Sequence, residues 1–138
     1  AIASSFALGA ALTTTGTAEL IADGVTGITA DDAFLSLVVI YLATLIITEL
    51  ITNNAAGVLM FPVALAVADA SGANAVPFVV VVMVAASAGF ITPLGYQTNL
   101  MVYGAGGYRF SDFVRFGVPL SALVAGVALA IVPRVWAL

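Results

Sequence analysis

Two apolar stretches, ITELITNNAAGVLM (Ile47–Met60) and ITPLGYQTNLMVYG (Ile91–Gly104), each contain a Thr-Asn pair and decide the fold. The pairs are Thr52-Asn53 and Thr98-Asn99. Each pair begins a run that is compatible with a helix, inside a segment so apolar that lipid would tolerate no unpaired backbone there. A buried helix N-terminus attracts anions because its free N–H groups carry partial positive charge. The two stretches therefore predict a transporter.

The composition places the chain in a membrane. Of its 138 residues, 63% are hydrophobic and 7% are charged, and Lys and His are absent. A soluble domain of this size needs more polar surface. The net charge of −4 argues against a nucleic acid partner, because no basic patch could displace phosphate counterions. The absence of Cys leaves neither disulfides nor thiolate metal sites.

Polar stretches at residues 23–33, 69–76 and 108–115, of which the first two contain Gly, separate four apolar regions. We expect these regions to form an all-α polytopic membrane protein. Its parts would be a partial transmembrane helix over residues 1–22, a re-entrant helical hairpin over 34–68, a discontinuous transmembrane helix over 77–107 and a transmembrane helix over 116–136. Since the chain begins without Met or a charged leader, we expect it to be part of a longer protein.

The re-entrant hairpin is predicted from the lengths of its two uncharged flanks. Residues 34–47 and 55–68 provide 14 residues each. A helix of that length reaches about 21 Å, whereas the hydrocarbon core of a bilayer is about 30 Å thick. Each flank is therefore suited to entering the membrane to mid-depth and returning, with Thr52 to Asn54 at the tip.

The discontinuous helix is predicted from Pro93 and Gly95, which interrupt an apolar region. Residues 77–90 would form its first half, residues 91–98 would be unwound, and residues 99–107 would resume the helix. Unwinding frees carbonyl groups at the end of one half and N–H groups at the start of the next. Carbonyls bind cations and N–H groups bind anions, so such a break suits ion binding.

Charge placement agrees with this topology. A returning hairpin puts the first two polar stretches on one side of the membrane, and the discontinuous helix carries the third to the other. The first two contain only acidic charges, and the third holds two Arg residues: Asp23, Asp31, Asp32 and Asp69, against Arg109 and Arg115. By the positive-inside tendency, the acidic stretches are expected outside and the Arg stretch in the cytoplasm.

The segments ITELITNNAA and SAGFITPLGYQTNLMVYGAGGYRFSDFVRFGVPL together resemble the C-terminal transport repeat of the divalent anion:sodium symporter family. This family comprises sodium-coupled transporters of dicarboxylates, citrate and sulfate. The resemblance runs from Thr48 to Leu120 and rests on two separated motifs with matching intervening length. It implies that the chain is the C-terminal half of a permease domain whose two inverted repeats each contain a re-entrant hairpin and a discontinuous helix.

The resemblance also implies the site residues. Thr52, Asn53 and Asn54 would contact a divalent anion from the hairpin tip, and the loop residues would approach it from the opposite side: Tyr96, Gln97, Thr98 and Asn99. Sodium would bind between tip and loop, at Thr48, the Ile51 carbonyl, Asn53 and the Gly95 carbonyl. Many members have Ser-Asn-Thr at the tip, and the GYQTN loop is more similar to the sulfate branch than to the dicarboxylate branch.

Further expectations follow from the resemblance. Transport would be sodium-coupled symport of sulfate or of a di- or tricarboxylate by alternating access. The partners would be the anion, Na⁺, the lipid bilayer and the N-terminal half of the same transporter. The complete protein would be a homodimer, integral to a bacterial inner membrane.

Residue chemistry supports sodium coupling independently of the family. Up to about Val132 in the last of them, the apolar regions contain no Lys, Arg or His, so a doubly charged anion could be held only by helix N-termini, hydroxyls and amides. Bound sodium would supply the missing positive charge, and carbonyl, hydroxyl and amide oxygens are suitable hard ligands for it.

Glu49 has two open interpretations. An acidic side chain near mid-membrane costs about 2.5 to 3.5 kcal/mol and is by default a functional candidate. It also lies close to the N–H groups of the hairpin tip, where it could brace the hairpin. The bracing interpretation is slightly favoured.

Other interpretations of the Thr-Asn pairs and other functional classes fit the sequence less well than transport. A single Thr-Asn pair is commonly just a helix N-cap, but two pairs at mid-membrane breaks favour binding. An ion channel, or another anion permease with a re-entrant pore loop, is the alternative, although ITPLGYQ lacks the Gly repeat of a potassium filter. An enzyme is not expected, because the sequence offers no His, Cys or nucleophile–base pair.

Overall fold

The computed structural model describes residues 2–30 and 32–138, and within them the chain forms helices and no strands. The all-α expectation is therefore confirmed for the described part of the chain. Three of the helices, α3 (Ala33–Leu50), α4 (Asn53–Ala70) and α7 (Phe110–Val135), are long and apolar enough to cross a membrane. The helices are α1 (Ile2–Thr14), α2 (Thr17–Thr29), α3 (Ala33–Leu50), α4 (Asn53–Ala70), α5 (Ala75–Ala86), α6 (Gln97–Ala105) and α7 (Phe110–Val135).

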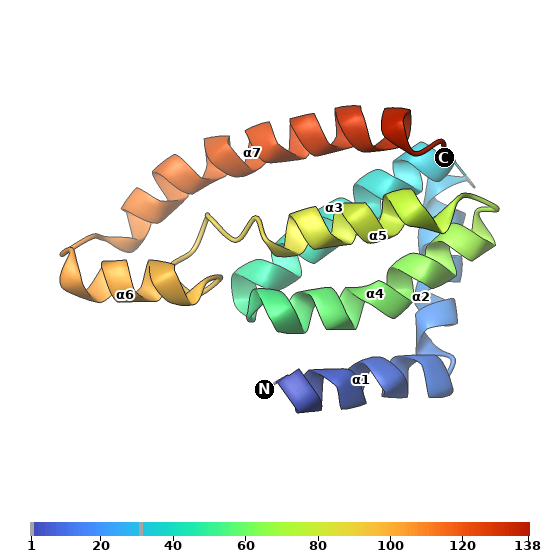
Figure 1. Ribbon diagram of the computed structural model, residues 1–138, viewed down its shortest axis with the longest axis horizontal. Coiled ribbons are helices and arrows are strands. Elements are labelled where there is room, and N and C mark those ends of the chain that lie inside the picture. Colours follow the sequence, from blue (N-terminus) through green and yellow to red (C-terminus); the bar gives the residue numbers. More distant parts are fainter. Residues whose placement is uncertain (1, 31) are drawn as a thin grey trace.

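Helices α3 and α4 form an antiparallel pair with its turn at Ile51 and Thr52 (Figure 1). Each helix has 18 residues and is therefore about 27 Å long, longer than the 14-residue flanks expected from the sequence. The extra length arises because α3 continues through Thr48 and Glu49, whose polar groups find partners on neighbouring segments. Length alone therefore no longer separates a re-entrant hairpin from two full crossings.

The helix break expected near Pro93 is present. Helix α5 ends at Ala86, α6 begins at Gln97, and Ser87–Tyr96 between them is not helical. The unwound segment thus starts before the expected Ile91 and ends before the expected Thr98. It starts early because side chains of α3 and α7 donate hydrogen bonds to the carbonyl groups of Ala86 and Ala88, so the backbone there needs no further helical turns.

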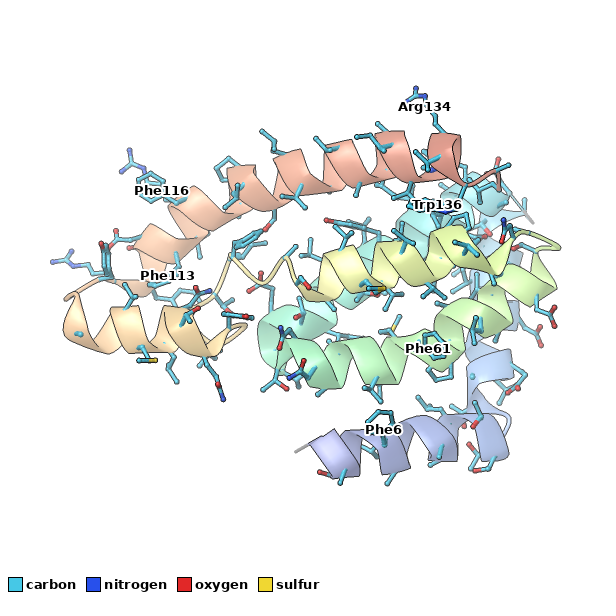
Figure 2. All side chains as sticks on the ribbon, in the orientation of Figure 1. Phe6, Phe61, Phe113, Phe116, Arg134 and Trp136 are labelled. Atoms are coloured by element: carbon cyan, nitrogen blue, oxygen red, sulfur yellow. The ribbon has the colours of Figure 1, made fainter. Side chains whose placement is uncertain are left out.

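Helix α7 extends alongside α5, the unwound segment and α6, whereas the α3–α4 turn ends beside the break (Figure 1). With 26 residues, α7 is about 39 Å long. It approaches the break closely at Gly117, where a Cβ atom would collide with the Phe90 carbonyl oxygen. Figure 2 shows Phe113 on the side of α7 toward α6, where its ring packs edge-on against Tyr103 at 5.9 Å.

The first expected helix is wrong in its extent. The described residues 2–22 do not form one helix, because Gly16 adopts a left-handed conformation (φ 71°) that separates α1 from α2. Helix α2 then continues through most of the expected loop at 23–33. Buried hydroxyls in this part bond back to helix carbonyls, Thr26 to Ala22 and Thr29 to Val25, so they need no solvent. Asp31 lies outside the described residues.

The expected loop at 108–115 is also too long. Helix α7 begins at Phe110 rather than at 116, because the Asp112 carboxylate accepts a hydrogen bond from the Arg109 N–H and closes its first turn. The turns nevertheless lie as the charge argument requires. The α2–α3 and α4–α5 turns share one end of the molecule, and the α6–α7 turn lies at the other (Figure 1).

The core lies between the hairpin and α5. Its largest buried side chains come from α3, α4 and α5, and large apolar side chains are exposed on the outer faces of the helices. A lipid-facing or partner-facing exterior of this kind, together with the three span-length helices, is that of an integral membrane protein. The buried side chains are Leu37, Ile40, Tyr41, Val67, Phe78 and Val81.

Candidate functional site

The hairpin tip presents the start of α4. Thr52 caps this helix, with its Oγ1 accepting a hydrogen bond of 3.4 Å from the Ala55 N–H. The Asn53 Oδ1 accepts one of 2.8 Å from the Asn54 N–H. Thr52 and Asn54 are exposed and Asn53 is half-buried. The three predicted tip residues therefore surround the positive end of α4, as an anion site would need.

The start of α6 forms the other side of the candidate site. Tyr96, Gln97 and Thr98 are exposed there, and the Tyr96 cap residue makes no side-chain hydrogen bond to the helix. Asn99 behaves differently from the other three. Its amide donates to the carbonyl oxygens of Gly89, at 2.9 Å, and Thr92, at 3.3 Å. In this structure Asn99 therefore fastens the unwound segment.

The tip and the break meet at Thr48 and Gly95. A Cβ atom on Gly95 would lie 3.1 Å from the Thr48 carbonyl oxygen, so only Gly fits without displacing backbone. The Thr48 hydroxyl donates a hydrogen bond of 2.7 Å to the Ala86 carbonyl oxygen at the end of α5. Two of the four predicted sodium ligands are thus neighbours, and the other two, Ile51 and Asn53, follow in the hairpin turn.

Glu49 is buried beside this junction, with 7% of its surface exposed. Its carboxylate accepts hydrogen bonds from the N–H groups of Ile91, at 2.9 Å, and Thr92, at 2.8 Å. The Thr92 hydroxyl donates to the Glu49 carbonyl oxygen at 2.9 Å. Glu49 therefore does brace, but it holds the unwound segment and not the N–H groups of its own hairpin tip.

Three carbonyls at and just after the end of α5 accept hydrogen bonds from side chains of three different helices. Thr48 of α3 bonds Ala86, Ser121 of α7 bonds Ala88 at 3.4 Å, and Asn99 of α6 bonds Gly89. Sequence reasoning missed Ser121, whose only signal is a small polar residue within an apolar helix. It also missed Thr92, a hydroxyl directly before Pro93.

A cation here would depend on neutral oxygens more than on an acidic cluster. Within residues 2–30 and 32–138 no group of three or more His, Cys, Asp or Glu is placed to hold a metal ion. Carbonyl, hydroxyl and amide oxygens from Thr48, Ile51, Asn53 and Gly95 are the kind of hard ligands that suit an alkali cation.

Comparison with known proteins covers nearly the whole chain. Residues 1–137 match the family model described as citrate transporter. The chain is 42% identical over 133 residues to sodium/sulfate cotransporter 1 of Chlamydomonas reinhardtii, and 43% identical over 135 residues to sodium/sulfate cotransporter 2 of the same alga. Each alignment covers 93% of this chain and 15% of the relative.

A cyanobacterial relative is also similar. The chain is 53% identical over 88 residues to an uncharacterised transporter of Synechocystis sp., an alignment that covers 64% of this chain and 14% of that protein. The chain therefore spans a small part of the length of the curated relatives that it matches.

Proposed function

Because the chain belongs to the citrate transporter family, within the divalent anion:sodium symporters, we propose that it forms the C-terminal repeat of a sodium-coupled symporter of divalent anions. Members of this family and the relatives above are transporters and not enzymes. In the complete protein, an inverted N-terminal repeat would supply the other side of the pathway, and the transporter would work by alternating access as a homodimer.

The proposed architecture treats the α3–α4 pair as re-entrant. Its support is the position of the turn, which ends beside the break between α5 and α6 while α7 continues past it (Figure 1). Residues 34–68 would enter and leave the membrane on one side, residues 77–107 would form the discontinuous transmembrane helix, and residues 116–136 would cross. Residues 1–22 would contribute a further membrane segment, kinked at Gly16.

The observation that carries the anion site is the contact between Thr48 and Gly95, which lies close in sequence to two helix N-termini. Helix α4 begins at Asn53, shortly after Thr48, and α6 begins at Gln97, shortly after Gly95. The three Arg residues of the chain all lie on or beside α7, outside the hairpin and the unwound segment, at positions 109, 115 and 134. An anion there would be held by N–H groups, hydroxyls and amides, from Thr52, Asn53, Asn54, Tyr96, Gln97 and Thr98.

Sodium would complete the site. Each helix N-terminus carries only about half a positive charge. Two such ends therefore do not balance the two negative charges of a divalent anion. Na⁺ bound by Thr48, the Ile51 and Gly95 carbonyls and Asn53 would supply the remainder. Coupling follows from this arrangement, because the anion site would be incomplete without the cation.

Sulfate is the first substrate to test, with di- and tricarboxylates second. Two relatives are named as sodium/sulfate cotransporters, and the GYQTN loop is similar to that branch. We expect the complete protein to lie in a bacterial inner membrane.

The test is uptake of radiolabelled sulfate by the complete transporter in liposomes. An inward sodium gradient should drive saturable uptake, and replacing sodium by choline should remove the stimulation. Uptake that does not depend on sodium would contradict symport. Unitary current steps in a planar bilayer would instead indicate the channel alternative.

A further inference from the structure

Glu49 and Thr92 join the hairpin to the unwound segment through backbone groups on both sides. The Glu49 carboxylate accepts the Ile91 and Thr92 N–H groups, and the Thr92 hydroxyl returns a hydrogen bond to the Glu49 carbonyl oxygen. Resting on the function proposed above, we propose that this pair, the Glu49–Thr92 clasp, positions Gly95 at the sodium site and thereby sets the sodium affinity of the transporter.

The clasp reaches Gly95 directly. The Thr92 hydroxyl oxygen accepts a hydrogen bond of 3.1 Å from the Gly95 N–H while it donates to Glu49. A hydroxyl can do both at once, having one donor and two acceptor sites. A continuous chain of hydrogen bonds therefore runs from Gly95 through Thr92 to Glu49. Ser87–Tyr96 is not helical, so no helical hydrogen bonds fix the direction of the Gly95 carbonyl. The hydrogen bonds of Thr92 to Gly95 and Glu49 fix it instead.

Charge and position act at the same place. A Cβ atom on Gly95 would lie 3.1 Å from the Glu49 Oε2, so the carboxylate borders the residue that is proposed to bind sodium. Its negative charge favours a nearby cation, and its hydrogen bonds fix the segment that carries the carbonyl ligand. Glu49 and Thr92 are positioning residues in this proposal, since the sodium ligands are other groups.

Matched variants separate the two contributions. Thr92→Val keeps the size of the side chain and the Glu49 charge but removes both hydroxyl hydrogen bonds. Thr92→Ser retains the hydroxyl and is the control. Glu49→Gln removes the charge and replaces one carboxylate acceptor by an amide donor, which cannot accept an N–H.

The experiment measures sulfate uptake by the complete transporter as a function of sodium, and the sulfate KM at saturating sodium. Thr92→Val should raise the half-saturating sodium concentration about tenfold, the effect of losing about one to two hydrogen bonds. The sulfate KM at saturating sodium should change less than about twofold, and Thr92→Ser should stay within about twofold of the parent in both. Folded protein is measured for every variant by size-exclusion chromatography.

Glu49→Gln tests whether Glu49 and Thr92 act together as one hydrogen-bonded unit. Its effect on half-saturating sodium should exceed that of Thr92→Val, and the double variant should be no worse than Glu49→Gln alone, because residues in one hydrogen-bond network are not additive. If Glu49→Gln does not fold, the Thr92 pair of variants decides the matter.

Two results would overturn the clasp. One is a Thr92→Val transporter with the sodium dependence of the parent, and the other is a change in sulfate KM at saturating sodium without a change in half-saturating sodium. Sodium-independent uptake by the parent protein would instead contradict the proposed function. The clasp would then also be contradicted, without any comparison of variants.

Discussion

Replacing Asn53 by Ala in the complete transporter is expected to lower sodium-stimulated sulfate uptake about 100-fold or more, while the protein still folds and inserts. Asn53 is the central side chain of the hairpin tip, and it is proposed to contact both the anion and sodium. Two charge-assisted hydrogen bonds lost from one site correspond to about 3 kcal/mol or more, which is the basis of this estimate. Radiolabelled uptake at saturating sodium measures the loss.

Asn74→Ala is the matched control. Asn74 caps α5 at the end of the molecule away from the hairpin tip, through its Oδ1 and the Val76 N–H at 3.0 Å. Its loss should cost about 1 kcal/mol of stability and leave uptake by the folded protein unchanged. Normal uptake by the Asn53→Ala protein at saturating sodium would remove Asn53 from the site.

Gly95→Ala is expected to reduce uptake about tenfold or more, through crowding alone. The added methyl group would meet the Thr48 carbonyl oxygen and the Glu49 Oε2, each at 3.1 Å. The backbone carbonyl cannot rotate away, so the unwound segment must move from the hairpin, and a displaced carbonyl ligand weakens the sodium site. Overpacking of this kind typically costs about 1 to 3 kcal/mol, which corresponds to about fivefold to 150-fold.

The corresponding control lies on α6. Gly104→Ala adds the same methyl group where nothing lies within 4 Å, and in a helix Ala is favoured over Gly by about 1 kcal/mol. Uptake and thermal stability of this variant should match or exceed those of the parent. Equal uptake by the Gly95 and Gly104 variants would show that close contact between tip and break is unimportant for transport.

The elements that could be predicted from the sequence are those marked by strong local signals. A helix start was predicted from Thr52 followed by Asn53 and Asn54, and an interrupted helix was predicted from Pro93 and Gly95. Both features are present, within a few residues of the expected positions. The separation of the acidic turns from the Arg-bearing turn followed from the expected number of membrane crossings, and the turns do lie at opposite ends of the molecule (Figure 1).

Helix ends were harder to predict because they depend on tertiary partners. Helix α3 runs on through Glu49 since α5 and the unwound segment satisfy its polar groups, which no local pattern reveals. The separation of α1 from α2 depends on one left-handed Gly16 among several glycines, most of which have ordinary conformations.

The site shows the same division. The residue types at the tip could be read from the motif, but the partners of Glu49 and Asn99 could not, because they lie 42 and 10 residues away along the chain. Asn99 was predicted to bind the anion because of its amide side chain and its place in the motif. In this structure that amide holds the unwound segment through hydrogen bonds. Ser121 gave no distinguishing signal, since a small polar residue in an apolar helix commonly bonds to its own backbone.

The depth of the hairpin tip is the central claim, and cysteine accessibility tests it most directly. The chain contains no Cys, so single cysteines can be introduced at chosen positions. Asp32 and Asp69 lie at the end of the molecule that holds the acidic turns, and Ser111 lies near the opposite end. Thr52 lies on the hairpin tip. In the complete transporter, an impermeant thiol reagent added outside should label positions 32 and 69. Position 111 should react only from the cytoplasmic side.

Labelling at position 52 decides between a re-entrant hairpin and two full crossings. A tip at mid-depth should react slowly, and sodium plus sulfate should slow it further, because the bound ions would cover it. If α3 and α4 both cross the membrane, a Cys at position 52 should react from the cytoplasmic side as fast as one at position 111, whether or not sodium and sulfate are present. That result would contradict the re-entrant hairpin and the anion site built on it.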